Sequence, residues 1–504
     1  MASGPDSNGV ARIAIGIVAA ALPFFAYGFF ILDHFYRAGG LLNDAGYLAH
    51  MMFAGGPSLL VGKAVLLGNP SFYAFHVAPL FTLTSFVSAP APLSIPQWFA
   101  LYVGAGHALL TVGVFWFLTG PCRMRSPGQA LLAGLLAVGF GFNGIAIGMI
   151  KFPHFEILIP AAIILFLIAW SQGRLILAGV WFALALAVRE DVGFQIAALL
   201  IVLTALDHWL GVAAREKATL AFIAAGLIYS LAIGGAQRAI FPDTSLLIWN
   251  YVGNPPFAHL SWPLVATRFF GYFTYRSYIM LPAVVAIVWA IAARNPYIVV
   301  GYVAFLPWFV LQMLAVNDAI GTIPYHYAYP FIIASFWPLL AMRLAARRGN
   351  TPMNRPATLA GFAAMLLASY IGIGRQANPS GADPWLAFTS IPSLSEERAV
   401  DRAIRVLHDA HGELGRIAAE DGVAALATAD YAEAETFWPQ PPRTADTVIY
   451  FPRGYCANAA RALIASARLN HVYTIVGTPM ILATDRGLAD MPILAPLLAP
   501  VSRD

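Results

Sequence analysis

Apolar segments long enough to cross a lipid bilayer follow one another along the first three quarters of this chain. A spanning helix needs about 20 mostly apolar residues. The chain has 11% charged residues, fewer than half of the roughly 25% found in soluble proteins. We therefore predict a mainly α, polytopic membrane protein. About eleven spans are expected, of which the fourth and fifth are short and could be tilted, re-entrant or shielded by neighbours: residues 13–32, 97–119, 128–149, 156–171, 175–188, 193–210, 218–240, 278–293, 297–315, 328–345 and 357–374.

The chain changes character after Arg375, where polar and charged residues return. Residues 395–419 have helical periodicity with charges on one face. We predict two domains, a transmembrane domain over 1–375 and a small α/β domain over 376–504. The sequence of the second contains no Walker loop, Rossmann glycine pattern or zinc-ligand spacing. Within it a second helix is predicted near 457–468, and short strands at Val423–Ala427, Thr447–Phe451, Val472–Val476 and Met480–Ala483.

Basic residues fall in alternate loops, which sets the expected orientation. The α/β domain then lies outside the cytoplasm, together with two long loops at 33–96 and 241–277. The formal net charge of +4 therefore reports topology, and we expect no nucleic-acid partner. With the N-terminus in the cytoplasm, every inside loop has at least one cation, as the positive-inside rule requires: Arg12, Arg123, Arg125, Arg174, Arg215, Lys217, Arg294, Arg343, Arg347, Arg348 and Arg355.

Three further features bear on the cellular membrane in which the protein resides, on its first apolar run and on its cysteines. Basic residues are nearly all Arg, a usage that fits a GC-rich bacterial genome, so we expect the bacterial plasma membrane. The first apolar run lacks a small-residue cleavage site before Asp33, which favours a retained helix over a cleaved signal peptide. Cys122 and Cys456 fall on opposite sides of the predicted membrane, so no disulfide is expected between them.

Ionisable residues gather on the predicted outer face. Ionisable groups at membrane depth are costly, so an arrangement of His, Asp and Glu by side indicates a functional site. The candidates are Asp44, His76, His154, Glu156, Arg189, Glu190, Asp191, Arg268, Arg276, His326 and Tyr327.

Each candidate also has a purely structural interpretation. Asp44 is a favoured helix N-cap, and His76, expected on an interfacial helix from Phe72 to Phe81, could be a satisfied structural histidine. The triplet from Arg189 to Asp191 could pair internally and mark a turn. Arg268 and Arg276, which stand among aromatic residues, could simply extend to the membrane interface.

At these residues the chain resembles a prokaryotic family of multipass membrane proteins of unknown function. The family is similar in layout to the GT-C glycosyltransferases, which have an acidic first outer loop, interfacial helices, many spans and often an outer C-terminal domain. The usual adjacent acidic pair after the first span is absent, because Asp33 and Asp44 stand eleven residues apart. The resemblance rests on Asn43–Gly46, Phe75–Leu80, Phe152–Glu156, Val188–Asp191 and His326–Pro330, and in the tail on Ala425–Ala429 and Ala445–Phe451.

The resemblance implies transfer of a sugar from a polyprenyl-phosphate donor to an acceptor glycan, lipid or protein. Asp44, or alternatively Asp33, would remove a proton from the acceptor hydroxyl. Arg189 and His326 would stabilise the departing phosphate, while His154, Glu156 and Glu190 would orient sugar hydroxyls or align the cations. The remaining donor and lipid contacts are expected from His76, Asp191, Arg268, Arg276 and Tyr327.

Two further questions stay open at this stage. A divalent metal held by Asp44, His154 and Glu156 is possible on ligand type, but it is not expected, because the phosphate needs only cations. A transporter or flippase of a lipid-linked sugar, or a non-catalytic envelope scaffold, are the alternative functions. An enzyme needs Asp44, His154, Arg189 and His326 around one cavity, whereas a scaffold does not.

Overall fold

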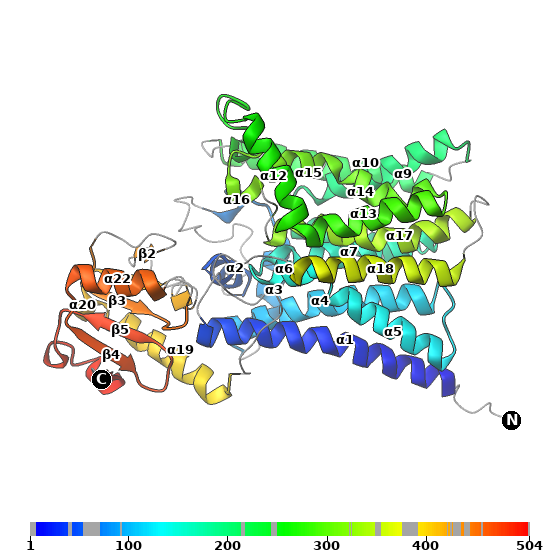
Figure 1. Cartoon of the computed structure of the whole chain (residues 1–504). Helices are drawn as coiled ribbons and strands as arrows, with labels where there is room; N and C mark the ends of the chain where they lie inside the picture. The colour runs from blue at the N-terminus through cyan, green and yellow to red at the C-terminus, as the bar shows by residue number, and fades with distance from the viewer. Residues whose placement is uncertain are drawn as a thin grey trace.

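The computed structural model describes residues 7–38, 43–53, 71–90, 93–212, 217–242, 249–321, 323, 325–347, 354–374, 392–420, 422–423, 426, 435–437, 444–454 and 457–501. Most of these residues are helical, and a small sheet domain lies at one end of the helical bundle (Figure 1). In this part of the chain seven helices are long and apolar enough to cross a membrane, or nine if each of two bent helix pairs is one span.

Each predicted span is helical, although the full number of membrane crossings remains a prediction. The two segments that were expected to be short are short in the structure as well, as α7 (Leu158–Ser171) and α8 (Leu175–Val188). In chain order the helices are α1 (Ser7–Asp33), α4 (Ile95–Thr119), α5 (Pro127–Gly141) with α6 (Gly144–Ile150), α7 (Leu158–Ser171), α8 (Leu175–Val188), α9 (Val192–Trp209), α10 (Lys217–Ile240), α13 (Ser277–Ala292), α14 (Val300–Ala304) with α15 (Leu306–Met313), α17 (Tyr329–Arg347) and α18 (Arg355–Gly374).

Burial separates central helices from peripheral ones. Within the most apolar stretch of the span that contains α17, 94% of the residues are buried, whereas the figure for α10 is 22%. The peripheral helices turn large apolar side chains outward, among them Ile17 on α1, Leu231 on α10 and Ile291 on α13. Large apolar side chains exposed along several helices are unusual on soluble monomers. Such a surface is expected of helices that face lipid.

Short polar residues fix where several helices begin and bend. The Ser94 and Ser126 hydroxyls each accept a hydrogen bond from the backbone N–H of the residue three positions on, Gln97 or Gln129. The side-chain oxygen of that glutamine accepts a hydrogen bond from the serine backbone N–H in turn. These capping boxes satisfy N–H groups that a helix start otherwise leaves without a partner. Asn143 accepts hydrogen bonds from two N–H groups at the start of α6, and α5 and α6 are bent by 42° there.

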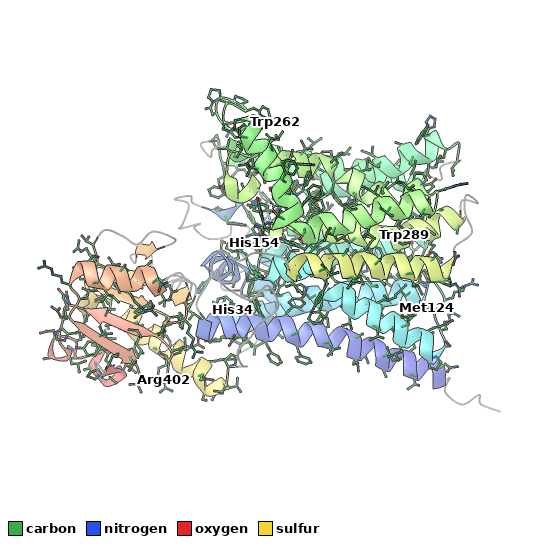
Figure 2. All side chains as sticks on the ribbon, viewed as in Figure 1. His34, Met124, His154, Trp262, Trp289 and Arg402 are labelled. Carbon is green, nitrogen blue, oxygen red and sulfur yellow. The ribbon has the colours of Figure 1, made fainter. Side chains whose placement is uncertain are left out.

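Basic side chains from separate loops gather at the end of the bundle opposite the sheet domain. A pocket of about 330 Å³ is lined there by Arg123 and Arg125 after α4, Arg174 before α8 and Arg343 on α17. Met124, which stands between two of these arginines, lies at the far end of the bundle from His154 (Figure 2). Four of the cations that the sequence assigned to one side therefore line one pocket, while the membrane topology stays a prediction.

The two long loops contain short helices. The first has α2 (Asn43–Phe53), η3 (Phe72–Ala74) and α3 (Leu80–Ser88). The prediction of one helix from Phe72 to Phe81 is wrong, because His76 lies in a non-helical segment. Pro79 disfavours helical geometry at the residue before it. The second loop has α11 (Trp249–Val252) and α12 (Trp262–Thr274), and α12 meets α13 at a 78° bend.

The C-terminal domain is a mixed sheet with helices on both faces. The strands are β1 (Ile417–Glu420), β2 (Glu435–Phe437), β3 (Thr447–Tyr450), β4 (His471–Ile475), β5 (Ile481–Thr484) and β6 (Leu498–Pro500). Their order in the sheet is β2-β1-β3-β5-β4-β6, with parallel pairing of β1 to β2 and β3 and antiparallel pairing elsewhere. Side chains alternate between faces along a strand: Val448 packs with α22 (Ala457–Ala467), and Ile449 packs in the other core, which includes α19 (Leu394–Asp409).

Three of the four predicted strands are confirmed as β3, β4 and β5, and the predicted helix near 457–468 is confirmed as α22. The strand expected at Val423–Ala427 is wrong, since its described residues are helical and the strand lies earlier, at β1. The helix expected over 395–419 ends at Asp409, and α20 (His411–Leu414) follows it. Gly415, with φ of 64°, turns the chain into β1, a backbone conformation that glycine adopts without strain.

The sheet domain contacts the helical bundle through α19. The Tyr36 hydroxyl, just beyond α1, donates to Asp401 at 3.3 Å, and the Gln97 amide on α4 donates to Glu397 at 2.7 Å. These bonds attach the domain at the end of the bundle where α1 finishes and α4 begins. The same end carries the candidate site described next.

Candidate functional site

Three segments that are distant in sequence meet at the sheet-domain end of the bundle. They are the turn before η4 (Phe155–Ile157), the break between α8 and α9, and η6 (Tyr325–Ala328) with the start of α17. His154 lies at this end of the helices, as does His34 beyond the end of α1 (Figure 2). The predicted site residues on these segments are therefore close together in space.

Arg189 lies at the centre of the hydrogen-bond network in this cluster. It is 3% exposed and stands in extended backbone after the last residue of α8. Its guanidinium donates to Glu156 at 3.0 Å and to both oxygens of Asp191, at 2.6 and 2.5 Å. It also donates to the Tyr329 hydroxyl at 3.1 Å. A forked guanidinium is suited to such bidentate pairing with a carboxylate, so this network fixes the relative positions of α8, α9, η4 and α17.

Glu156, 1% exposed, joins the arginine to a pair of histidines. One carboxylate oxygen accepts from Arg189, and the other is in close hydrogen-bond contact with His154 Nδ1. The His154 ring in turn stacks on the His326 ring, with centroids 4.1 Å apart and planes 12° from parallel. Burial lowers the pKa of His154 well below its ordinary value, and His326, His76 and Arg189 act in the same direction. The His154 ring is therefore neutral near pH 7.

A second carboxylate–histidine pair borders the cluster. Glu190 accepts from His76 Nδ1 at 2.8 Å and from the backbone N–H of Val77 at 3.0 Å. The His76 and Glu190 side chains are 27% and 16% exposed, more than Arg189 or Glu156. The pair therefore forms the solvent-accessible edge of the site. It also ties the first long loop to the α8–α9 break.

Three residues that contact the network, Gln195, Tyr329 and Trp308, were not among the predicted site residues. The Gln195 amide donates to Asp191 at 3.3 Å and is hydrogen-bonded to the Tyr329 hydroxyl. Gln195 stands four residues after Asp191, a spacing that brings side chains together on a helix, and this was the available signal. Tyr329 and Trp308 also contact Arg189 through their rings, whose centroids lie 5.4 and 5.8 Å from the guanidinium carbon.

The triplet from Arg189 to Asp191 both pairs locally, as a turn would, and contacts distant segments, as a functional site would. Arg189 and Asp191 do pair locally, as a turn marker would. Arg189 also binds Glu156, 33 positions away in the sequence, and Glu190 binds His76. Tyr327 lies beside His326, with ring centroids 4.2 Å apart. The triplet therefore holds together segments from three parts of the chain.

Other predicted site residues lie elsewhere or outside the described side chains. Arg268, 3% exposed, donates to the carbonyls of Met313 and Ala315 at 2.8 and 2.6 Å, near the end of α15. Arg276 precedes α13 and lies 5.5 Å from the Tyr275 ring centroid. Their described contacts do not join the cluster. Asp33, the alternative base, is buried at the end of α1. Asp44 belongs to α2, but its side chain lies outside the described residues.

The cluster offers one set of metal-binding groups. His154, Glu156 and His326 each contribute a ligand atom, and these atoms lie within 4.8 Å of one another. The sequence had grouped Asp44 with His154 and Glu156, and His326 is the residue that folding adds. A cavity of about 10 Å³ is lined by His154 and His326 together with apolar side chains. It has room for an ion or one water and is too small for a phosphate or a sugar.

Comparisons with known proteins add no identity, because no family model and no curated protein match this sequence.

Proposed function

We propose that this protein is a membrane glycosyltransferase that moves a sugar from a polyprenyl-phosphate donor to an acceptor hydroxyl at the outer face of the bacterial plasma membrane. The observation that carries the proposal is the buried network of Arg189, Glu156, Asp191 and His154 at the sheet-domain end of the bundle. Burying several ionisable groups in an apolar bundle is costly and is typical of functional sites.

One accessible pair in the cluster suits the base that such a transfer requires. The acceptor oxygen must lose a proton as it attacks the anomeric carbon, and the bond from that carbon to the phosphate oxygen must break. The His76–Glu190 pair is accessible, and Glu190 engages Nδ1 of the ring, which leaves Nε2 to take the proton. Asp44 is the base that the resemblance implies. The expected base is therefore one of these two groups.

Arg189 receives a different role from the one expected of it. Its guanidinium is engaged by two carboxylates and a tyrosine hydroxyl, so we assign it to positioning Glu156 and Asp191. The donor is expected at the more exposed edge, near His76 and Glu190, because the cavity between the histidines is too small for it.

Position along the bundle argues for an enzyme over a transporter. Alternating access places the substrate site near mid-membrane between matched halves. Here the described ionisable cluster lies at one end of the helices, the end at which α19 attaches. Chemistry at one surface needs only this arrangement.

The test is transfer by the purified full-length chain in lipid vesicles, with a panel of radiolabelled polyprenyl-phosphate sugars and a lipid-extracted envelope fraction as acceptor. Loss of the acting base should slow transfer by about 10²–10⁴-fold, so Asp44→Asn and His76→Gln are compared directly. Asp409→Asn, an exposed carboxylate in the sheet domain, is the matched control. Unchanged transfer in both site variants removes these groups as bases. If no polyprenyl-phosphate sugar in the panel supports transfer, the proposed glycosyltransferase function is wrong.

A further inference from the structure

Two histidines and a glutamate from separate segments converge beside the arginine network. His154 and Glu156 flank Phe155 on the turn into α7, while His326 comes from η6, before α17. One ligand atom from each lies within 4.8 Å of the others. The sequence separation between the two histidines is large, so tertiary folding alone brings these three groups together.

His326 has a buried nitrogen without a partner. Its Nδ1 makes no hydrogen bond within the described part of the chain, and the residue is 8% exposed. Buried polar atoms are nearly always hydrogen-bonded, so an exception of this kind calls for a ligand, an ion or a water. The ion-sized cavity beside it is lined by His154, His326 and apolar residues such as Val103 and Ile157.

The charges of the connected residues are also out of balance. Three carboxylates, Glu156, Asp191 and Glu190, face one guanidinium, that of Arg189. These four groups have a formal charge of −2. The Glu190 and Asp191 side chains are 16% and 26% exposed, so water offsets part of this charge. A divalent cation bound by the buried Glu156 would reduce it further.

We propose that His154, Glu156 and His326 bind one divalent ion of the zinc class. Two imidazoles and a carboxylate are a ligand set typical of zinc sites that keep a fourth position open, and imidazole favours Zn²⁺ over Mg²⁺ or Ca²⁺. The ion takes the place of the proton between His154 Nδ1 and Glu156. Tetrahedral ligation at about 2.0–2.1 Å places ligand atoms roughly 3.4 Å apart, a spacing within the 4.8 Å that the three ligand atoms span.

Arg189 acts on this site through Glu156. Its bond to one carboxylate oxygen leaves the other oxygen toward His154, and outer contacts of this kind orient a metal ligand. The open position of the ion is left to a water, because the cavity is too small for a phosphate. Metal binding is therefore independent of the proposed function.

The experiment measures zinc on the full-length protein in detergent micelles. The protein is stripped with a chelator, titrated with ZnCl₂ and passed through a desalting column, and bound zinc is determined by mass spectrometry. One equivalent is expected. His154→Gln and His326→Gln should each weaken binding by at least about tenfold. His208→Gln, at an exposed position near the end of α9, should leave it unchanged.

A second readout covers variants that fail to run as a monodisperse species. Co²⁺ added to the unaltered protein should give the visible absorption of a tetrahedral site with nitrogen ligands, and Zn²⁺ should abolish that absorption. No zinc above the chelated control, or equal losses in all three histidine variants, overturns the proposal. Zinc binding without sugar transfer leaves the metal site standing and overturns the glycosyltransferase. Sugar transfer without zinc binding leaves the glycosyltransferase standing and overturns the metal site.

Discussion

Removal of the Arg189 side-chain charge is the most severe single change that the structure indicates. Arg189→Met keeps an apolar stem of similar length but deletes hydrogen bonds to Glu156, Asp191 and Tyr329. Glu156 is 1% exposed and cannot be rehydrated without local opening, whereas the Asp191 side chain is 26% exposed. The cost therefore comes mainly from Glu156, which would be left as a buried carboxylate without its cation.

The expected loss of unfolding free energy is about 3–5 kcal/mol, the range for breaking a buried ion pair by removing one partner. That corresponds to roughly two to three and a half powers of ten in the unfolding equilibrium. The measurement is reversible unfolding by SDS in mixed micelles, followed by helical circular dichroism. Because the loss is assigned to Glu156, the double variant Arg189→Met with Glu156→Gln should recover about 1–3 kcal/mol.

The reasoning is refuted by either of two results. Arg189→Met within about 1 kcal/mol of the unaltered protein, the scale of an exposed pair, would mean that the network is hydrated. A double variant less stable than Arg189→Met would mean that Glu156 is stabilised by some other group. Gln195→Met serves as the control for a polar-to-apolar change at the same site without loss of charge.

Two further predictions concern packing and pH. Gly193→Ala should lower stability by about 1–3 kcal/mol or more, because a Cβ there would lie 2.1 Å from the Gly226 carbonyl oxygen on α10. Gly179→Ala, which places its Cβ in open space, should be neutral or slightly stabilising. Thermal unfolding of both variants tests this prediction. Burial raises the pKa of Glu397 and of Asp401, so the docked state binds protons more readily than a released α19. Attachment should therefore be complete in acid and weaken as the pH rises from about 4, the ordinary carboxyl value. Hydrogen exchange in α19 should then rise with pH more steeply than its intrinsic rate, and Glu397→Gln with Asp401→Asn should remove the excess.

The sequence by itself determined the helical, apolar character of the first three quarters of the chain and the start of a different domain after Arg375. It did so because hydrophobic runs and helical periodicity are local properties, readable without knowing what packs against what. The same holds for α22 and for β3, β4 and β5. The errors fell where a local signal is weak, at the short strand β1 and at the proline-interrupted segment around His76.

The candidate residues were predictable one by one, since an ionisable side chain between apolar runs is visible in the sequence. Their partners were not. The bond from Arg189 to Glu156, the stacking of His154 on His326 and the contact of His76 with Glu190 join segments far apart along the chain. Helix packing decides such contacts, and packing depends on how side chains of several helices fit together at once. The sequence therefore supplied the chemical groups, and only the tertiary structure decided which of them form one site.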